Sequence, residues 1–200
     1  MRKALLLAAL LLFGCSEPAV PQDRTVGAAA PQTAVENDQL TAASCGVERW
    51  AVKTLTDPAA SRVNLTPVAS TVQALRLLPA PAQPSARAGV ELRTFTVRAT
   101  ITAYKQEADS DVHLAVVDAK GLTMIFEMPA AKCLGASPQR ARMTAAQAAW
   151  DARYPVSTTY RTVRQPVTVT GVAFFDRIHG QRGVAPNGIE LHPLTSLTFG

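Results

Sequence analysis

Acidic and histidine side chains gather in two short segments of this 200-residue chain. One segment is D-S-D-V-H at 109–113, and the other is G-I-E-L-H at 188–192. In an extended strand alternate residues share a face, so the acid and the histidine two positions later point the same way in both segments. Carboxylate oxygens and imidazole nitrogens could together hold a divalent metal ion. The predicted ligands are Asp111, His113, Glu190 and His192.

Two interpretations of this cluster remain open from the sequence. A metal ion with an open coordination position could activate water, which would make the protein a hydrolase of the phosphodiesterase or nuclease kind. Alternatively, His113 and His192 are core histidines bonded to the nearby acids in a buried polar network. The chain contains neither H-E-x-x-H nor paired C-x-x-C, so no standard metal-binding spacing decides between them.

A second candidate site is the segment from Arg177 to Gly188, which is long for a loop in a compact domain. Arg177, His179 and Arg182 are its predicted ligand-binding residues. Guanidinium groups form paired hydrogen bonds with anions and also suit sugars, and the chain has a formal net charge of +5. An ordinary long hairpin is the alternative. Nucleic acid is a less favoured ligand because few aromatic side chains are available for base stacking.

The pattern of apolar residues predicts the elements that must position these side chains. Strands are expected at 48–55, 91–104, 112–119, 122–128, 167–175 and 188–199, with a bend between Leu92 and Phe95 and a tight turn at 120–121. Helices are expected at 71–78, capped by Thr71, and at 143–153, capped by Thr144.

The order of these elements predicts the fold class. From residue 91 onward it is strand, strand, strand, helix, strand, strand, which is the order of the OB-fold. We therefore expect a mainly β protein, a five- to six-stranded OB-like barrel with one helix between the third and fourth barrel strands. The loops after the first and fourth barrel strands flank the ligand face of such barrels. This would bring Asp109, Asp111 and His179 to one side.

The N-terminus indicates export. Arg2 and Lys3 precede an apolar run at 4–13, and Cys15 follows it. This arrangement is typical of a signal peptide, and its ending resembles a bacterial lipoprotein signal in which the cysteine is lipidated. A cleaved signal without lipid is the alternative. The resemblance implies anchoring through Cys15 to the outer membrane, with the protein facing the periplasm.

The remaining chain divides into a tether at 16–44 and one domain at 45–200, in which 45–90 is an N-terminal addition to the barrel. The tether has no aromatic residue to bury. If Cys15 is lipidated, Cys45 and Cys133 are the two remaining cysteines. An even number of cysteines in an oxidising compartment favours a disulfide between them. Two buried free thiols are the alternative.

The strings H-G-Q-R-G-V-A-P-N-G-I-E-L-H-P-L at 179–194 and D-S-D-V-H-L at 109–114 resemble a group of exported bacterial proteins of uncharacterised function. The resemblance covers most of residues 45–197 and implies that these strings form a shared site or structural core. It names no substrate and no protein partner. Three functions therefore remain: binding of an anionic or carbohydrate ligand, metal-dependent hydrolysis, and a non-catalytic scaffold role in the envelope.

Overall fold

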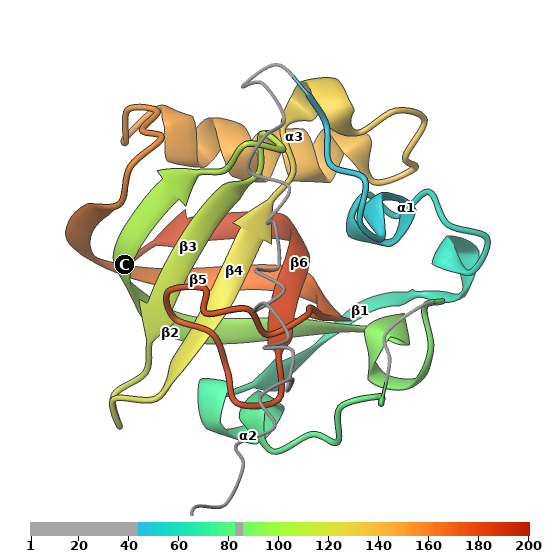
Figure 1. Ribbon diagram of the computed structural model, residues 1–200, viewed down its shortest axis with the longest axis horizontal. Coiled ribbons are helices and arrows are strands. Elements are labelled where there is room, and N and C mark those ends of the chain that lie inside the picture. The colour runs from blue at the N-terminus through green and yellow to red at the C-terminus, as the bar shows by residue number, and fades with distance from the viewer. Residues whose placement is uncertain (1–43, 83–85) are drawn as a thin grey trace, which may run out of the picture. The chain divides into compact units, whose positions relative to one another are not determined.

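The computed structural model describes residues 44–82 and 86–200. Figure 1 shows the arrangement of its helices and strands. The helices are α1 (Trp50–Lys53), α2 (Val72–Arg76) and α3 (Arg140–Asp151), with short 3-10 helices η2 (Ala60–Arg62), η3 (Gly89–Leu92) and η4 (Ala131–Cys133). The strands are β1 (Asn64–Ser70), β2 (Arg93–Gln106), β3 (Val112–Val117), β4 (Thr123–Met128), β5 (Arg161–Phe175) and β6 (Ile189–Phe199).

Five of the strands close into a ring. The hydrogen-bonded order is β1-β2-β3-β4-β6-β5, and β2 also pairs with β5. Within the ring the pairs are antiparallel except β4–β6, which is parallel. The helix α3 lies in sequence between β4 and β5. The predicted OB-like barrel with its helix after the third barrel strand is therefore confirmed.

The core fills the interior of the ring and is covered at its ends by helices. Trp150 of α3 is 2% exposed and packs edge-to-face on Tyr104 of β2, with ring centroids 5.1 Å apart. Val72 and Leu75 of α2 belong to the same core. In Figure 1, α3 and α2 lie at opposite sides of the strands. Burial of these aromatic and aliphatic groups supplies the main driving force for folding.

The cap of α2 and the tight turn after β3 were predicted correctly from local patterns in the sequence. The hydroxyl of Thr71 accepts a hydrogen bond from the amide of Ala74 at 3.0 Å, which caps α2 as expected. The tight turn after β3 contains Gly121 at φ 80°, and the Asp118 carboxylate accepts from the amides of Lys120 and Leu122. Short polar side chains commonly stabilise turns in this way.

The prediction of a strand at 48–55 is wrong. This segment contains α1, and Arg49 before it adopts a left-handed conformation with φ 47°. In a half-buried strand Lys53 would lie on the face opposite Trp50 and Val52, yet it is only 8% exposed. Carboxylates from distant parts of the chain surround Lys53, so tertiary contacts, and not the local pattern, determine that this side chain is buried. The strand β1, which pairs in parallel with β2, was not predicted.

Other boundaries differ in smaller ways. Thr144 lies inside α3, whose N-cap is Gln139. The change of phase near Leu92 marks the end of η3, and the irregularity in β2 comes later, between Ile101 and Ala103. β5 begins at Arg161, before the predicted 167. The expected signal, Cys15 and the tether up to residue 43 lie outside the described residues. Within the described part, no helix is long and apolar enough to cross a membrane.

Candidate functional site

A cluster of acidic and histidine side chains lies on the outer side of the barrel. Alternate residues of β3, β4 and β6 enter the core, so the residues between them face outward. Because these three strands are neighbours in the ring, their outward side chains form one continuous surface. The ionisable residues on it are His113, Glu127, Glu190 and His192.

These outward-facing side chains are buried. His113 and His192 are 0% exposed, Glu190 is 1% exposed, and Glu127 is 4% exposed. Asp111, at the end of the β2–β3 loop, is also 0% exposed. Charged groups are rarely buried to this degree without partners. Two segments cover the surface: residues 44–55 with α1, and the β5–β6 loop at 176–188.

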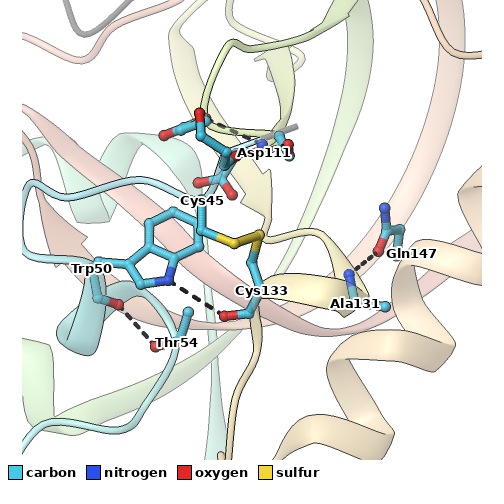
Figure 2. Close-up of a disulfide and its surroundings, with 10 residues drawn as sticks. Cys45, Trp50, Thr54, Asp111, Ala131, Cys133 and Gln147 are labelled. Carbon is cyan, nitrogen blue, oxygen red and sulfur yellow. Dashed lines mark hydrogen bonds between the residues drawn. A yellow bond between two sulfur atoms is a disulfide. The ribbon is translucent and has the colours of Figure 1, made fainter. Parts of the chain in front are cut away.

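The first covering segment is held by the predicted disulfide, which is confirmed. Cys45 and Cys133 are bonded, with Cα atoms 5.5 Å apart. The indole of Trp50 donates a hydrogen bond to the Cys133 carbonyl at 3.3 Å, and Figure 2 shows this ring beside the disulfide, with Asp111 on the other side of Cys45. Ser110 also donates to the carbonyl of Ser44 at 3.0 Å. The disulfide therefore fastens this segment next to the cluster.

The same segment delivers an ammonium group to the cluster. Burial lowers the pKa of Lys53, but the surrounding carboxylates of Glu127, Asp111, Asp176 and Asp109 outweigh burial and raise it. The Lys53 ammonium also lies 5.7 Å from the centre of the Phe174 ring. The ring of His192 packs on Phe174 as well, at 5.4 Å between centroids.

The second covering segment, the β5–β6 loop, lies on β3 and β4 (Figure 1). Gly183 has φ 92°, and a Cβ atom there would come within 2.9 Å of Ala115 Cβ. Ala185 is fully buried, and Asn187 donates hydrogen bonds to two backbone carbonyls around α2. This loop therefore covers a surface that OB-folds commonly use for ligands.

The ionisable groups form a continuous chain. Asp111 Oδ2 lies 3.2 Å from His192 Nε2, and His192 Nδ1 lies 2.8 Å from Glu127 Oε2. The other oxygen of Glu127 lies 3.0 Å from His113 Nδ1, which is 3.5 Å from the half-buried Glu107. Glu127 is thus the centre of the chain, shared by two histidines.

Both histidines are held toward the protonated form. His113 Nε2 donates to the carbonyl of Arg182 at 2.9 Å, since a carbonyl oxygen can only accept. Burial lowers the pKa of His113, but Glu127 and Glu107 outweigh burial and raise it. Burial also lowers the pKa of His192, and Asp111 and Glu127 outweigh it and raise this pKa to about 9.

The carboxyl groups differ from one another. Burial raises the pKa of Asp111 to about 6, that of Glu107 to about 7, and that of Glu190 well above its usual range. Burial acts on Glu127 in the same direction, but the two histidines beside it hold its pKa well below the usual range. The histidines therefore favour the ionised form of Glu127, whereas burial favours the neutral form of Glu190.

The structure places three of the four predicted metal ligands beside Glu127, but in two different groups. Ligand atoms of Asp111, Glu127 and His192 lie within 4.8 Å of one another, as do those of Glu107, His113 and Glu127. Glu190 faces the same surface but belongs to neither group. Its Oε2 has no hydrogen-bond partner among the described residues.

The sequence analysis missed Glu127, Glu107 and Lys53. The signal for Glu127 was present, because it follows the alternation of β4 and lies directly opposite His113 in the β3–β4 pairing. Lys53 could not be found in this way, because its segment was predicted as a strand and its contacts come from distant parts of the chain.

The three residues predicted in the long loop contact different neighbours. The Arg177 side chain is 68% exposed and lies 3.8 Å from Glu48. His179 lies 4.0 Å from Asp176. The exposed guanidinium of Arg182 lies over the Tyr160 ring, 5.3 Å from its centre.

A cleft opens where the two covering segments meet. Its volume is about 550 Å³, which is within the range of small-molecule sites. Charged groups of both signs line it, together with apolar side chains. The lining includes Glu48, Arg49, Asp176, Arg177, Ile178 and Pro186. Arg177 is the predicted ligand-binding residue that lies in this cleft.

The chain matches no family model, no curated protein and no solved structure. The fold and the site therefore rest on the geometry described above.

Proposed function

We propose that this chain is an exported, lipid-anchored envelope protein whose OB-like barrel binds a carbohydrate in the cleft beside Arg177. The observation that carries the proposal is the exposed pair of Arg177 and Glu48, whose charged groups lie 3.8 Å apart at the cleft. One comes from the β5–β6 loop and the other from the segment before α1. Neither side chain is committed to a buried ion pair, so both are available to a ligand.

The balance of charge in the cleft favours a sugar over a simple anion. Two guanidinium groups, from Arg49 and Arg177, face two carboxylates, from Glu48 and Asp176. Arg49 is already engaged by Glu91 through paired contacts of 2.9 and 2.8 Å. Sugar hydroxyl groups both donate and accept hydrogen bonds, so they can use arginine donors and carboxylate acceptors together. Apolar side chains in the lining would contact the C–H faces of the sugar.

The disulfide supports the expected export. Disulfides persist in the periplasm and outside the cell, whereas reductants keep most cytosolic thiols reduced. The bond between Cys45 and Cys133 therefore agrees with the signal expected at 1–15. Lipidation of Cys15 would hold the domain at the outer membrane, facing the periplasm.

Hydrolysis has less support than binding. Asp111, Glu127 and His192 are between 0% and 4% exposed and lie beneath both covering segments. A substrate would have to displace one of these segments to reach them. The cleft is open without such a movement, so it is the better candidate for contact with a ligand.

The test is binding of the full-length protein, extracted in detergent, to an array of neutral and acidic oligosaccharides. We expect binding to neutral members, with Arg177→Ala and Glu48→Ala each weakening it about tenfold or more, since a hydrogen bond to a charged group contributes roughly 1.5–3 kcal/mol. Arg164→Ala is the matched control, because Arg164 is an exposed arginine of β5 outside the cleft.

Three outcomes would contradict the proposal. Absence of binding to every oligosaccharide would overturn it. Binding restricted to acidic sugars and abolished by salt would favour the anionic ligand instead. Equal losses in the Arg177 and Arg164 variants would show that the cleft is not the binding site.

A further inference from the structure

We propose that Asp111, Glu127 and His192 form a buried binding site for one divalent transition-metal ion, with Zn²⁺ as the reference ion. This inference is independent of carbohydrate binding. The three residues come from the end of the β2–β3 loop, from β4 and from β6. Each offers a ligand atom, and these atoms lie within 4.8 Å of one another. Ligands of one zinc ion lie roughly 3–4 Å apart. Asp111 and Glu127 face opposite nitrogens of the His192 ring, so side chains would have to turn until one imidazole nitrogen and both carboxylates share the ion.

The second observation is that the polar atoms of this group lack hydrogen-bond partners. Both oxygens of Asp111 and both ring nitrogens of His192 are buried without a hydrogen bond among the described residues. The imidazole has carboxylate oxygens at 2.8 and 3.2 Å, yet neither contact has hydrogen-bond geometry. Buried polar atoms are normally satisfied, so this arrangement calls for a further partner. A metal ion would supply one.

Neighbouring contacts would support the ligands. Glu127 receives a hydrogen bond from His113 Nδ1 at 3.0 Å, and the other nitrogen of His113 is fixed by the Arg182 carbonyl. His192 can give one nitrogen to the ion, while its other nitrogen lies next to the carboxylate on that side, at 2.8 or 3.2 Å. Such outer contacts orient metal ligands and fix the histidine tautomer.

The charge around the site also favours a cation. Four carboxyl groups, those of Glu107, Asp111, Glu127 and Glu190, interact electrostatically across the cluster. The Lys53 ammonium faces them, and the ammonium of Lys105 lies 3.3 Å from Glu107. Histidine must be neutral to bind a metal ion, so it would add no positive charge. A divalent ion would then replace the positive charge that a protonated His192 gives the cluster.

The position of the site indicates a structural role. β4 and β6 pair over a short stretch, Ile125 with Glu190 and Phe126 with Leu191, and this is where the barrel closes. An ion bound by Glu127 and His192 would link these two strands and join them to the β2–β3 loop. Because the ligands are covered on all sides, the ion would enter during folding and leave slowly.

The experiment measures metal in the full-length protein, expressed without a histidine tag and exported, by elemental analysis and native mass spectrometry. We expect close to one equivalent of metal per chain. We expect its loss in Asp111→Asn and in His192→Gln, and its retention in His179→Ala, which removes an exposed histidine of the β5–β6 loop. These replacements keep the size of the two buried side chains.

A second measurement covers the case in which the buried variants do not fold. Wild-type protein is unfolded with chelator, refolded with Zn²⁺ or Co²⁺ and compared with protein refolded in chelator. We expect bound Zn²⁺ to raise Tm, and bound Co²⁺ to show the d–d absorption of a nitrogen and oxygen site. The proposal would be overturned if the wild-type protein folds without metal and neither ion changes its Tm or its absorption spectrum. The cluster would then bind protons but no metal ion.

Discussion

His192 and Glu127 face each other with Nδ1 2.8 Å from Oε2, in a place where the two side chains are 0% and 6% exposed. The second oxygen of the same carboxylate bonds His113. A single glutamate on β4 therefore links a histidine of β3 to a histidine of β6. This linkage crosses the parallel pairing that closes the barrel.

This relationship predicts how the stability of the metal-free protein depends on pH. The pKa of His192 rises from its usual 6.5 to about 9 on folding, because Asp111 and Glu127 outweigh the effect of burial. Below pH 6.5 both the folded and the unfolded chain hold the proton, and the stabilisation is complete. Between 6.5 and 9 only the folded chain holds it, so stability falls by about 3 kcal/mol in total as pH rises.

Urea unfolding in chelator at pH 7, 8 and 9 would measure this fall, with His192→Gln as the comparison. Asp111, whose pKa is raised to about 6, completes most of its titration below this range, whereas Glu107, with a pKa of about 7, still loses protons near its lower end in both proteins. The variant should therefore show a shallower profile than wild type. Parallel profiles for the two proteins would contradict the raised pKa of His192.

A matched pair of glycines tests whether the β5–β6 loop is packed on the barrel. Gly183 and Gly180 have nearly equal φ angles of 92° and 94°, so alanine strains the backbone similarly at both. A Cβ at 183 would also come within 2.9 Å of Ala115 Cβ, whereas nothing lies within 4 Å at 180. We expect Gly183→Ala to cost about 1–3 kcal/mol more than Gly180→Ala, the typical cost of overpacking.

Urea denaturation of both variants would measure this difference. Equal losses would mean that the loop does not press on β3, and that the cover over His113 is looser than described.

Removal of the disulfide should destabilise the domain and loosen the segment before α1. Cys45 and Cys133 are separated by 88 positions in sequence, and closing such a loop is worth roughly 4 kcal/mol in the chain-entropy model. The double variant Cys45→Ala/Cys133→Ala should lose about that much in urea unfolding. It should also be cut faster by trypsin after Arg49 and Lys53. A loss below about 1 kcal/mol with unchanged proteolysis would show that packing around Trp50 suffices.

The expected lipid anchor can be tested directly. Cells producing the full chain and fed labelled palmitate should incorporate label into the protein, which should fractionate with membranes. Cys15→Ala should remove the label, while Cys45→Ala/Cys133→Ala should retain it. Label that persists without Cys15 would place the lipid elsewhere, and absence of label in the wild type would favour a cleaved signal without lipid.

Much of the barrel could be predicted because its strands carry their own signals. In 112–117 and 123–128, side chains alternate between the core and the outer face, and a glycine turn separates the two strands. The helix α2 carries its own cap at Thr71. Local patterns of this kind depend on a few neighbouring residues, so they can be read without knowledge of the fold. Asp111, His113 and His192 were found in the same way.

The tertiary structure decided which side of each strand is buried and which charges meet. The outer faces of β3, β4 and β6 would be exposed in a bare barrel. Among the described residues, the disulfide-held segment and the β5–β6 loop cover them, and Tyr160 packs on the His113 ring. The sequence therefore predicted a strand around Lys53, because nothing local distinguishes a solvent-facing charge from one facing a distant partner. An unpaired charge is unfavourable when remote segments bury it, so these ionisable groups must contact one another. Their contacts therefore depend on residues that are far apart in the sequence.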